Sequence, residues 1–139
     1  MLTAKGSART PLGPTRKDRV LTRCFRIQAQ VINVCNKKIL WINTYLPTDP
    51  QTIEAFDPTA LNEVLVEVET IINSVSHTEI VWAGDLNWDP GRNSMFSRIM
   101  REFLEKIGLV SLWNHHPVDF THMHTDNKSI STVDHFLIS

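Results

Sequence analysis

The strongest chemical signal in the sequence is a carboxylate and a carboxamide that follow a short apolar run. Asp85 and Asn87 come directly after Ile80-Val81-Trp82-Ala83 and a glycine. Because side chains two residues apart on an extended backbone point the same way, both groups should face one spot at the carboxyl end of a strand. There a carboxylate can orient or deprotonate a water, and a carboxamide can donate to a phosphate oxygen. The alternative is a plain polar turn, which the same residue types favour.

Two further groups of polar residues lie at the ends of apolar runs. Asn43 and Tyr45 share a strand face, and the Tyr45 phenol either donates to an oxyanion or simply points to solvent. Asp134 lies among apolar residues, where a carboxylate is costly unless it is paired, for example with a histidine that it orients. The adjacent His135 points to the opposite face, so we expect it to be a half-exposed strand residue and not that partner.

A group of histidines precedes this last segment, and the sequence leaves its role open. The members are His115, His116, His122 and His124. His122 and His124 are two residues apart and could ligate one metal ion from a strand, but no Cys or Glu lies at a zinc-motif spacing. Thr121, beside them, could place a hydroxyl near the same crevice.

The hydropathy pattern predicts the elements that must position these groups. The expected elements are strands over about 19–34, 39–45, 80–84 and 132–138 and helices over about 59–75 and 94–107. Both helices have apolar residues at helical spacing, the first after Asp57-Pro58 and the second before Gly108. The strands 39–45 and 80–84 are apolar enough to need cover on both faces. Strands alternating with helices indicate an α/β fold.

Composition narrows the class of protein. The chain has 139 residues, of which 42% are hydrophobic and 21% are charged, as is typical of one globular domain. No apolar run approaches the roughly 18 residues that cross a bilayer, and residues 1–14 lack the apolar core of a secretory signal, so we expect neither a membrane protein nor a secreted one. Two cysteines are too few for a disulfide framework, which favours an intracellular location, in the nucleus or cytoplasm.

Charge is distributed unevenly along the chain. The net charge is -1, yet half of the 14 Lys and Arg residues lie within residues 1–26. We expect residues 1–18 to be a flexible basic arm, either solvated or in contact with phosphates, and residues 19–139 to be one domain. The acidic remainder is unusual for a protein that only binds nucleic acid, and less unusual for an enzyme whose carboxylates hold a divalent cation against a phosphate.

In their order, these motifs resemble the endonuclease/exonuclease/phosphatase superfamily. The matching segments are Asn-Thr-Tyr-Leu-Pro at 43–47, Gly-Asp-Leu-Asn at 84–87, Phe-Thr-His at 120–122 and Ser-Thr-Val-Asp-His at 131–135. The nearest likeness is the apurinic-endonuclease-like nuclease domain of non-LTR (LINE-type) retrotransposons. This resemblance implies a four-layer α/β sandwich, with two mixed β-sheets face to face and helices outside. It also implies hydrolysis of DNA phosphodiesters with Mg²⁺, or Mn²⁺ in its place, to nick target DNA for an associated reverse transcriptase domain.

The resemblance further implies roles for individual residues. The implied catalytic residues are Tyr45, Asp85, Asn87 and Asp134, and the implied DNA-contacting residues are Asn43, Thr121 and Ser131. Asp85 would position or activate the nucleophilic water and touch the metal, while Asn87 would hold the phosphate oxygens. Tyr45 would contact the scissile phosphate, and Asp134 would orient a catalytic histidine.

The sequence departs from the family pattern at both ends. The family begins with strands that carry an Asn and a metal-binding Glu, and residues 1–18 contain neither residue type. The family ends in Ser-Asp-His, which does not follow 131–135. We therefore expect a fragment of the domain that binds Mg²⁺ weakly and nicks little DNA by itself. The alternative is a non-catalytic α/β module, derived from such a domain, that binds nucleic acid or protein.

Overall fold

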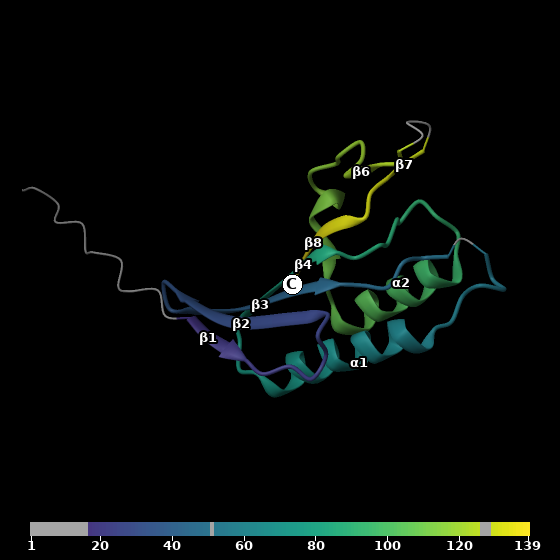
Figure 1. Cartoon of the computed structure of the whole chain (residues 1–139). Helices are drawn as coiled ribbons and strands as arrows, with labels where there is room; N and C mark the ends of the chain where they lie inside the picture. The colour runs from purple at the N-terminus through teal and green to yellow at the C-terminus, as the bar shows by residue number, and fades with distance from the viewer. Residues whose placement is uncertain (1–16, 51, 126–128) are drawn as a thin grey trace, which may run out of the picture.

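The computed structural model describes residues 17–50, 52–125 and 129–139, which leaves out all but the last two residues of the predicted basic arm. One mixed sheet dominates the described part, and both helices lie on the same side of it (Figure 1). In spatial order its strands are β1 (Lys17–Val20), β2 (Ile27–Val34), β3 (Lys37–Tyr45), β4 (Glu79–Asp85), β8 (Asp134–Ile138) and β5 (Val110–Ser111). The other elements are α1 (Thr59–Ser74), α2 (Met95–Ile107), the 3₁₀-helix η1 (Leu112–Asn114) and a small sheet of β6 (His122–Met123) and β7 (Ile130–Ser131).

The predicted α/β class is confirmed, and so are the predicted strands that became β3, β4 and β8. Both helices also lie where their periodicity predicted them. Ser94 begins α2 by accepting a hydrogen bond from the Ser97 N–H at 3.0 Å, and Gly108 ends it with a φ of 72°. None of the helices among the described residues is long and apolar enough to cross a membrane.

The long first strand predicted over 19–34 is instead two strands, β1 and β2, which pair antiparallel to each other. The loop between them begins at Leu21, where the backbone turns back. Its polar groups are satisfied locally, because the Thr22 hydroxyl donates to the Ile27 carbonyl at 3.0 Å and the Ile27 N–H donates to the Cys24 carbonyl at 3.1 Å. The alternation of polar and apolar residues is in fact interrupted here, at Thr22-Arg23 and Cys24-Phe25, and this interruption marks the loop.

The core lies between the sheet and the two helices. The sheet contributes Ile27, Ala29, Leu40, Ile42, Ile80, Trp82 and Leu137, all of them buried. Trp82 of β4 packs edge-to-face against Phe103 of α2, with ring centroids 5.9 Å apart. The Trp82 indole N–H donates to the Thr44 hydroxyl at 2.8 Å, so the polar edge of this buried ring is satisfied.

The opposite face of the sheet is largely open in the described part of the chain. Asn43, Tyr45 and Phe136 point to this side and are exposed. Trp41 and Phe136 meet edge-to-face at 6.4 Å and shield the small Ala83 between their strands. The expectation that β3 and β4 would be covered on both faces is therefore wrong for the described residues. In place of the implied four-layer sandwich, the described residues form a six-stranded sheet with helices on one face and a separate two-stranded sheet, so the sandwich is incomplete.

Candidate active site

Tyr45, Asp85 and Asp134 lie side by side at one end of the sheet. Tyr45 of β3 is the register partner of Asp85 of β4, which in turn is the partner of Asp134 of β8. Because residues directly opposite each other on paired strands point to the same face, the phenol and the two carboxylates gather on the open side. Strand pairing thus brings together three of the four residues that the resemblance implies to be catalytic.

Gly84 lets the strands approach each other just before this cluster. Its φ is 134°, and a Cβ atom there would lie 2.0 Å from the carbonyl oxygen of Thr44. No other residue type fits such a position without moving the neighbouring strand. The glycine before Asp85 is thus a packing requirement that brings the end of β4 close to β3.

Asn87 reaches the cluster by a turn and not along an extended strand. β4 ends at Asp85, and Asn87 has a φ of 48°, so the prediction that the two side chains align by strand alternation is wrong. The Asn87 backbone N–H donates to Asp85 Oδ1 at 3.1 Å, and its side-chain Nδ2 donates to the Leu46 carbonyl at 2.8 Å. One Nδ2 proton and the Oδ1 atom remain to contact a ligand.

Thr121 holds the start of β8 in place. Its hydroxyl oxygen accepts hydrogen bonds from the backbone N–H groups of Val133 and Asp134, each at 3.0 Å. The side chain implied to contact DNA thus already has a positioning role within the protein. The Asp134 carboxylate itself is exposed, and among the described residues no hydrogen bond joins it to a histidine.

The environment of Asp85 disfavours its charged form. Partial burial raises the pKa of the Asp85 carboxyl, and the neighbouring Asp134 carboxylate raises it further. The Asn87 N–H and the His122 imidazole act in the opposite direction and lower this pKa. A carboxylate with a raised pKa is a stronger base, which suits a group that takes a proton from water.

A cavity of about 200 Å³ opens beside this cluster. Its lining includes Asp85, Asn87, Arg92, His122, His124 and Ser131. The His122 and His124 rings lie edge-to-face at 4.9 Å, so this half of the histidine group joins the site. Within the described residues, no three His, Cys, Asp or Glu side chains are arranged to hold one metal ion.

A second cavity, of about 310 Å³, lies on the other side of Asp85. Asn43 and Tyr45 line it as the sequence led us to expect, but so do Phe25 and Arg26, which the sequence analysis missed. The hairpin register could have found them, since it pairs Ile27 with Thr44 and therefore sets Arg26 opposite Tyr45. The incorrectly predicted long first strand obscured that signal.

His135 is a buried residue, and the expectation of a half-exposed position is wrong. Its exposed fraction is 1%, because strand alternation puts it on the same face as the buried Leu137. Its Nε2 lies 2.7 Å from the Trp88 carbonyl and 3.0 Å from the Thr132 carbonyl, so we assign the ring proton to Nε2. Burial lowers the pKa of His135 and keeps the ring neutral. This histidine ties β8 to the turn that carries Asn87.

No protein-family model matches the sequence, and no curated protein matches it. Solved structures do. The endonuclease domain of TRAS1, a telomere-specific non-LTR retrotransposon, is 15% identical with a TM-score of 0.66, over 88% of this chain and 53% of that chain. An endonuclease/exonuclease/phosphatase family protein from Leptotrichia buccalis is 14% identical with a TM-score of 0.54, over 91% of this chain and 50% of its own. The human Nocturnin catalytic domain is 15% identical with a TM-score of 0.54, over 92% of this chain and 47% of its own. The chain thus spans about half the length of these structures. The likeness confirms the α/β fold of this superfamily, while the described residues do not form all four layers of the implied sandwich.

Proposed function

Because this chain has the fold of the endonuclease/exonuclease/phosphatase proteins, we propose that it supplies part of a phosphodiesterase site that hydrolyses DNA with Mg²⁺. The observation that carries the proposal is the register of three strands, which sets Tyr45, Asp85 and Asp134 side by side. An acidic cluster alone would have many uses. Asp85 lines both cavities, with the Asn87 carboxamide on one and the Tyr45 phenol on the other. A phenol, a carboxylate and a carboxamide are groups that can assist in-line attack on a phosphodiester.

Each residue has a role that its surroundings support. Asp85 orients the attacking water and accepts its proton, since its carboxylate lies at the end of β4 and lines both cavities. Asn87 donates its remaining Nδ2 proton to a phosphate oxygen, and the turn that holds it is fixed by the Leu46 carbonyl. Tyr45, whose side chain is half exposed, donates its phenol proton to the same phosphate from the neighbouring strand.

The carboxylate oxygens of Asp85 and Asp134 could supply part of the coordination shell of Mg²⁺. Mg²⁺ is commonly bound through one or two carboxylates together with phosphate and water, and Asp85 and Asp134 are two apposed carboxylates. When bound, the cation would neutralise charge that develops on the phosphate. Mn²⁺ has the same preference for oxygen and could take its place. In a complete retrotransposon-type protein, the nick would serve an associated reverse transcriptase domain.

The first test uses nicking of supercoiled plasmid DNA in Mg²⁺. We expect no nicking above background by residues 1–139 alone, and clear nicking by a longer product in which the flanking strands of the domain are restored. In that product Asp85→Ala and Asn87→Ala should each lower the rate by at least about 100-fold. Asp119→Ala is the matched control, because this exposed carboxylate lines neither cavity.

Two results would count against the proposal. Nicking that survives Asp85→Ala would place the chemistry elsewhere. Salt-dependent DNA binding by the longer product with no nicking would favour the non-catalytic binding module instead. A readout independent of activity is Mn²⁺ titration followed by NMR, in which paramagnetic broadening should centre on Asp85 and Asp134 and diminish in Asp85→Asn.

A further inference from the structure

We propose that Phe25, Arg26 and Tyr45 form a clamp for one nucleotide of a DNA strand, in which a nucleobase stacks on Phe25 and a backbone phosphate binds Arg26. We call these three residues the aromatic clamp. The inference rests on the proposed function in one respect, since it takes Asp85 as the place where the same strand reacts.

The Arg26 guanidinium is held between two aromatic rings. Its central carbon lies 5.2 Å from the Phe25 ring centroid and 5.3 Å from the Tyr45 ring centroid. These distances are within the range of cation–π attraction. One guanidinium nitrogen, Nη1, donates to the Tyr45 carbonyl at 3.5 Å, which leaves most of its five N–H donors for a phosphate.

The clamp is built on the sheet, although Phe25 comes from the loop before β2. The Tyr45 N–H donates to the Arg26 carbonyl at 3.1 Å, so the β2–β3 ladder sets the spacing of the two residues. The same loop is tied down by the Thr22 hydroxyl. A cation fixed in this way loses little freedom when it binds an anion, which favours affinity.

The Phe25 ring is directed to solvent and not to the core. Its exposed fraction is 89%, and that of Tyr45 is 52%. A phenylalanine so exposed contributes little to folding, yet its ring can carry a nucleobase, because every base has a π-face. Burying such a ring against a base removes apolar surface from water in the complex only.

The position of the clamp indicates a nucleic-acid ligand. Its cavity of about 310 Å³ is also lined by Asp85 and by the carboxamides of Gln28 and Asn43. The cavity thus offers a stacking ring, a cation for phosphate and carboxamides that can pair with a base edge. A strand with one phosphate at Asp85 would bring its neighbouring nucleotide to these groups.

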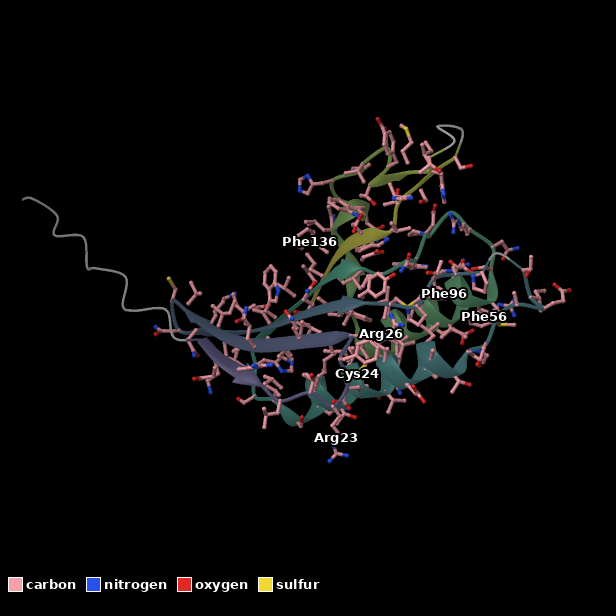
Figure 2. All side chains as sticks on the ribbon, viewed as in Figure 1. Arg23, Cys24, Arg26, Phe56, Phe96 and Phe136 are labelled. Atoms are coloured by element: carbon pink, nitrogen blue, oxygen red, sulfur yellow. The ribbon has the colours of Figure 1, made fainter. Side chains whose placement is uncertain are left out.

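Loop residues outside the clamp offer matched controls. Leu21 has the same exposed fraction as Phe25, 89%, but lines no cavity found beside Asp85. Arg23 lies three residues before Arg26 and points away from the sheet, toward the lower edge of the view in Figure 2. Leu21→Ala and Arg23→Ala therefore remove an exposed apolar side chain and a cation, respectively, outside the clamp.

The experiment measures binding of a short single-stranded DNA that contains 2-aminopurine, with EDTA present so that no metal chemistry contributes. Phe25→Ala should weaken binding about tenfold, or about 1.4 kcal/mol, and abolish the quenching of 2-aminopurine fluorescence. Phe25→Trp should retain both the affinity for the DNA and the quenching of its fluorescence. Arg26→Ala should weaken binding and lower the slope of log K against log salt by about one. Leu21→Ala should bind as the unchanged chain does, and Arg23→Ala should leave the quenching intact.

The binding experiment and the nicking test can give different results, so the clamp and the proposed hydrolysis can each fail alone. If Phe25→Ala and Leu21→Ala bind alike, or if the 2-aminopurine fluorescence is insensitive to Phe25, the clamp is overturned even where Asp85-dependent nicking is seen. If quenching depends on Phe25 but nicking fails in the longer product, the clamp stands and the proposed hydrolysis does not. Equal thermal unfolding of the four alanine variants would show that altered folding is not the cause.

Discussion

Among single residues, Asp85 and Asp134 face each other because β4 and β8 pair at that register. Two carboxylates held in this way repel each other, and partial burial of Asp85 adds to the cost of its charge. The surroundings that raise the basicity of Asp85 therefore also lower the stability of the fold. This trade-off is expected at an active site and not at a purely structural turn.

Asp85→Asn should stabilise the protein at neutral pH, by roughly 0.5 kcal/mol after screening by solvent. The amide oxygen still accepts the Asn87 N–H, while the repelled charge is gone. Because the pKa of Asp85 is raised in the folded state, the gain should be full at neutral pH and shrink as the pH falls toward the ordinary value of 3.8. Urea unfolding at several pH values measures the difference in unfolding free energy between Asp85→Asn and the unchanged chain. A gain that is unchanged in an Asp134→Asn background would contradict the assigned repulsion.

His135 makes stability depend on pH in the opposite sense. Its pKa is lowered by burial, so the unfolded chain takes up a proton more readily than the folded one. The stability it contributes should be present in full above the ordinary pKa of 6.5 and be lost as the pH falls toward the lowered value. Each unit of lowering corresponds to about 1.4 kcal/mol.

The measurement is the difference in unfolding free energy between the unchanged chain and His135→Gln, from pH 7.5 to pH 5. We expect the difference to shrink toward acid pH. His115→Gln is the matched control, since this histidine is exposed. If His135→Gln fails to fold, NMR titration of the His135 ring replaces it, and an ordinary or raised midpoint would refute the assignment.

At the scale of elements, the close approach of β3 and β4 depends on Gly84. Gly84→Ala should cost roughly 1–3 kcal/mol from backbone conformation alone, and more from the contact with the Thr44 carbonyl. Gly108→Ala separates the two effects, because Gly108 also has a positive φ but open space around it. Thermal unfolding should show the larger loss for Gly84→Ala. Equal losses would mean that strand packing contributes nothing.

The helices and central strands were predictable because the apolar residues of each follow a strong pattern along the sequence. The apolar stripe of α1 and the apolar runs of β3 and β4 are local signals that tertiary structure did not override. The same reasoning placed Tyr45 and Asp85 at strand ends and Asp134 in the last strand. It failed for Asn87 and His135, because a turn with positive φ and the choice of buried face are set by neighbouring strands that no local pattern reveals.

At the scale of the whole molecule, aromatic side chains and the candidate site share one face. On the open side of the sheet, the Phe136 ring contacts both Trp41 and Trp113, with ring centroids 6.4 Å and 6.3 Å apart, respectively. This face also carries Tyr45 and the approach to Asp85. The helix-covered face, by contrast, holds the core and no candidate catalytic side chain among the described residues.

The strand order has a consequence for the way the protein is made. β8 lies between β4 and β5, so a strand that is synthesised after both of them enters the sheet between them. Until it does, β4 has an unpaired edge, which can join to other chains. Closing the long loop between β4 and β8 also carries the largest entropy cost among the contacts of the site. The carboxylate pair of Asp85 and Asp134 therefore forms only after β8 has left the ribosome, later than the pairing of β3 with β4.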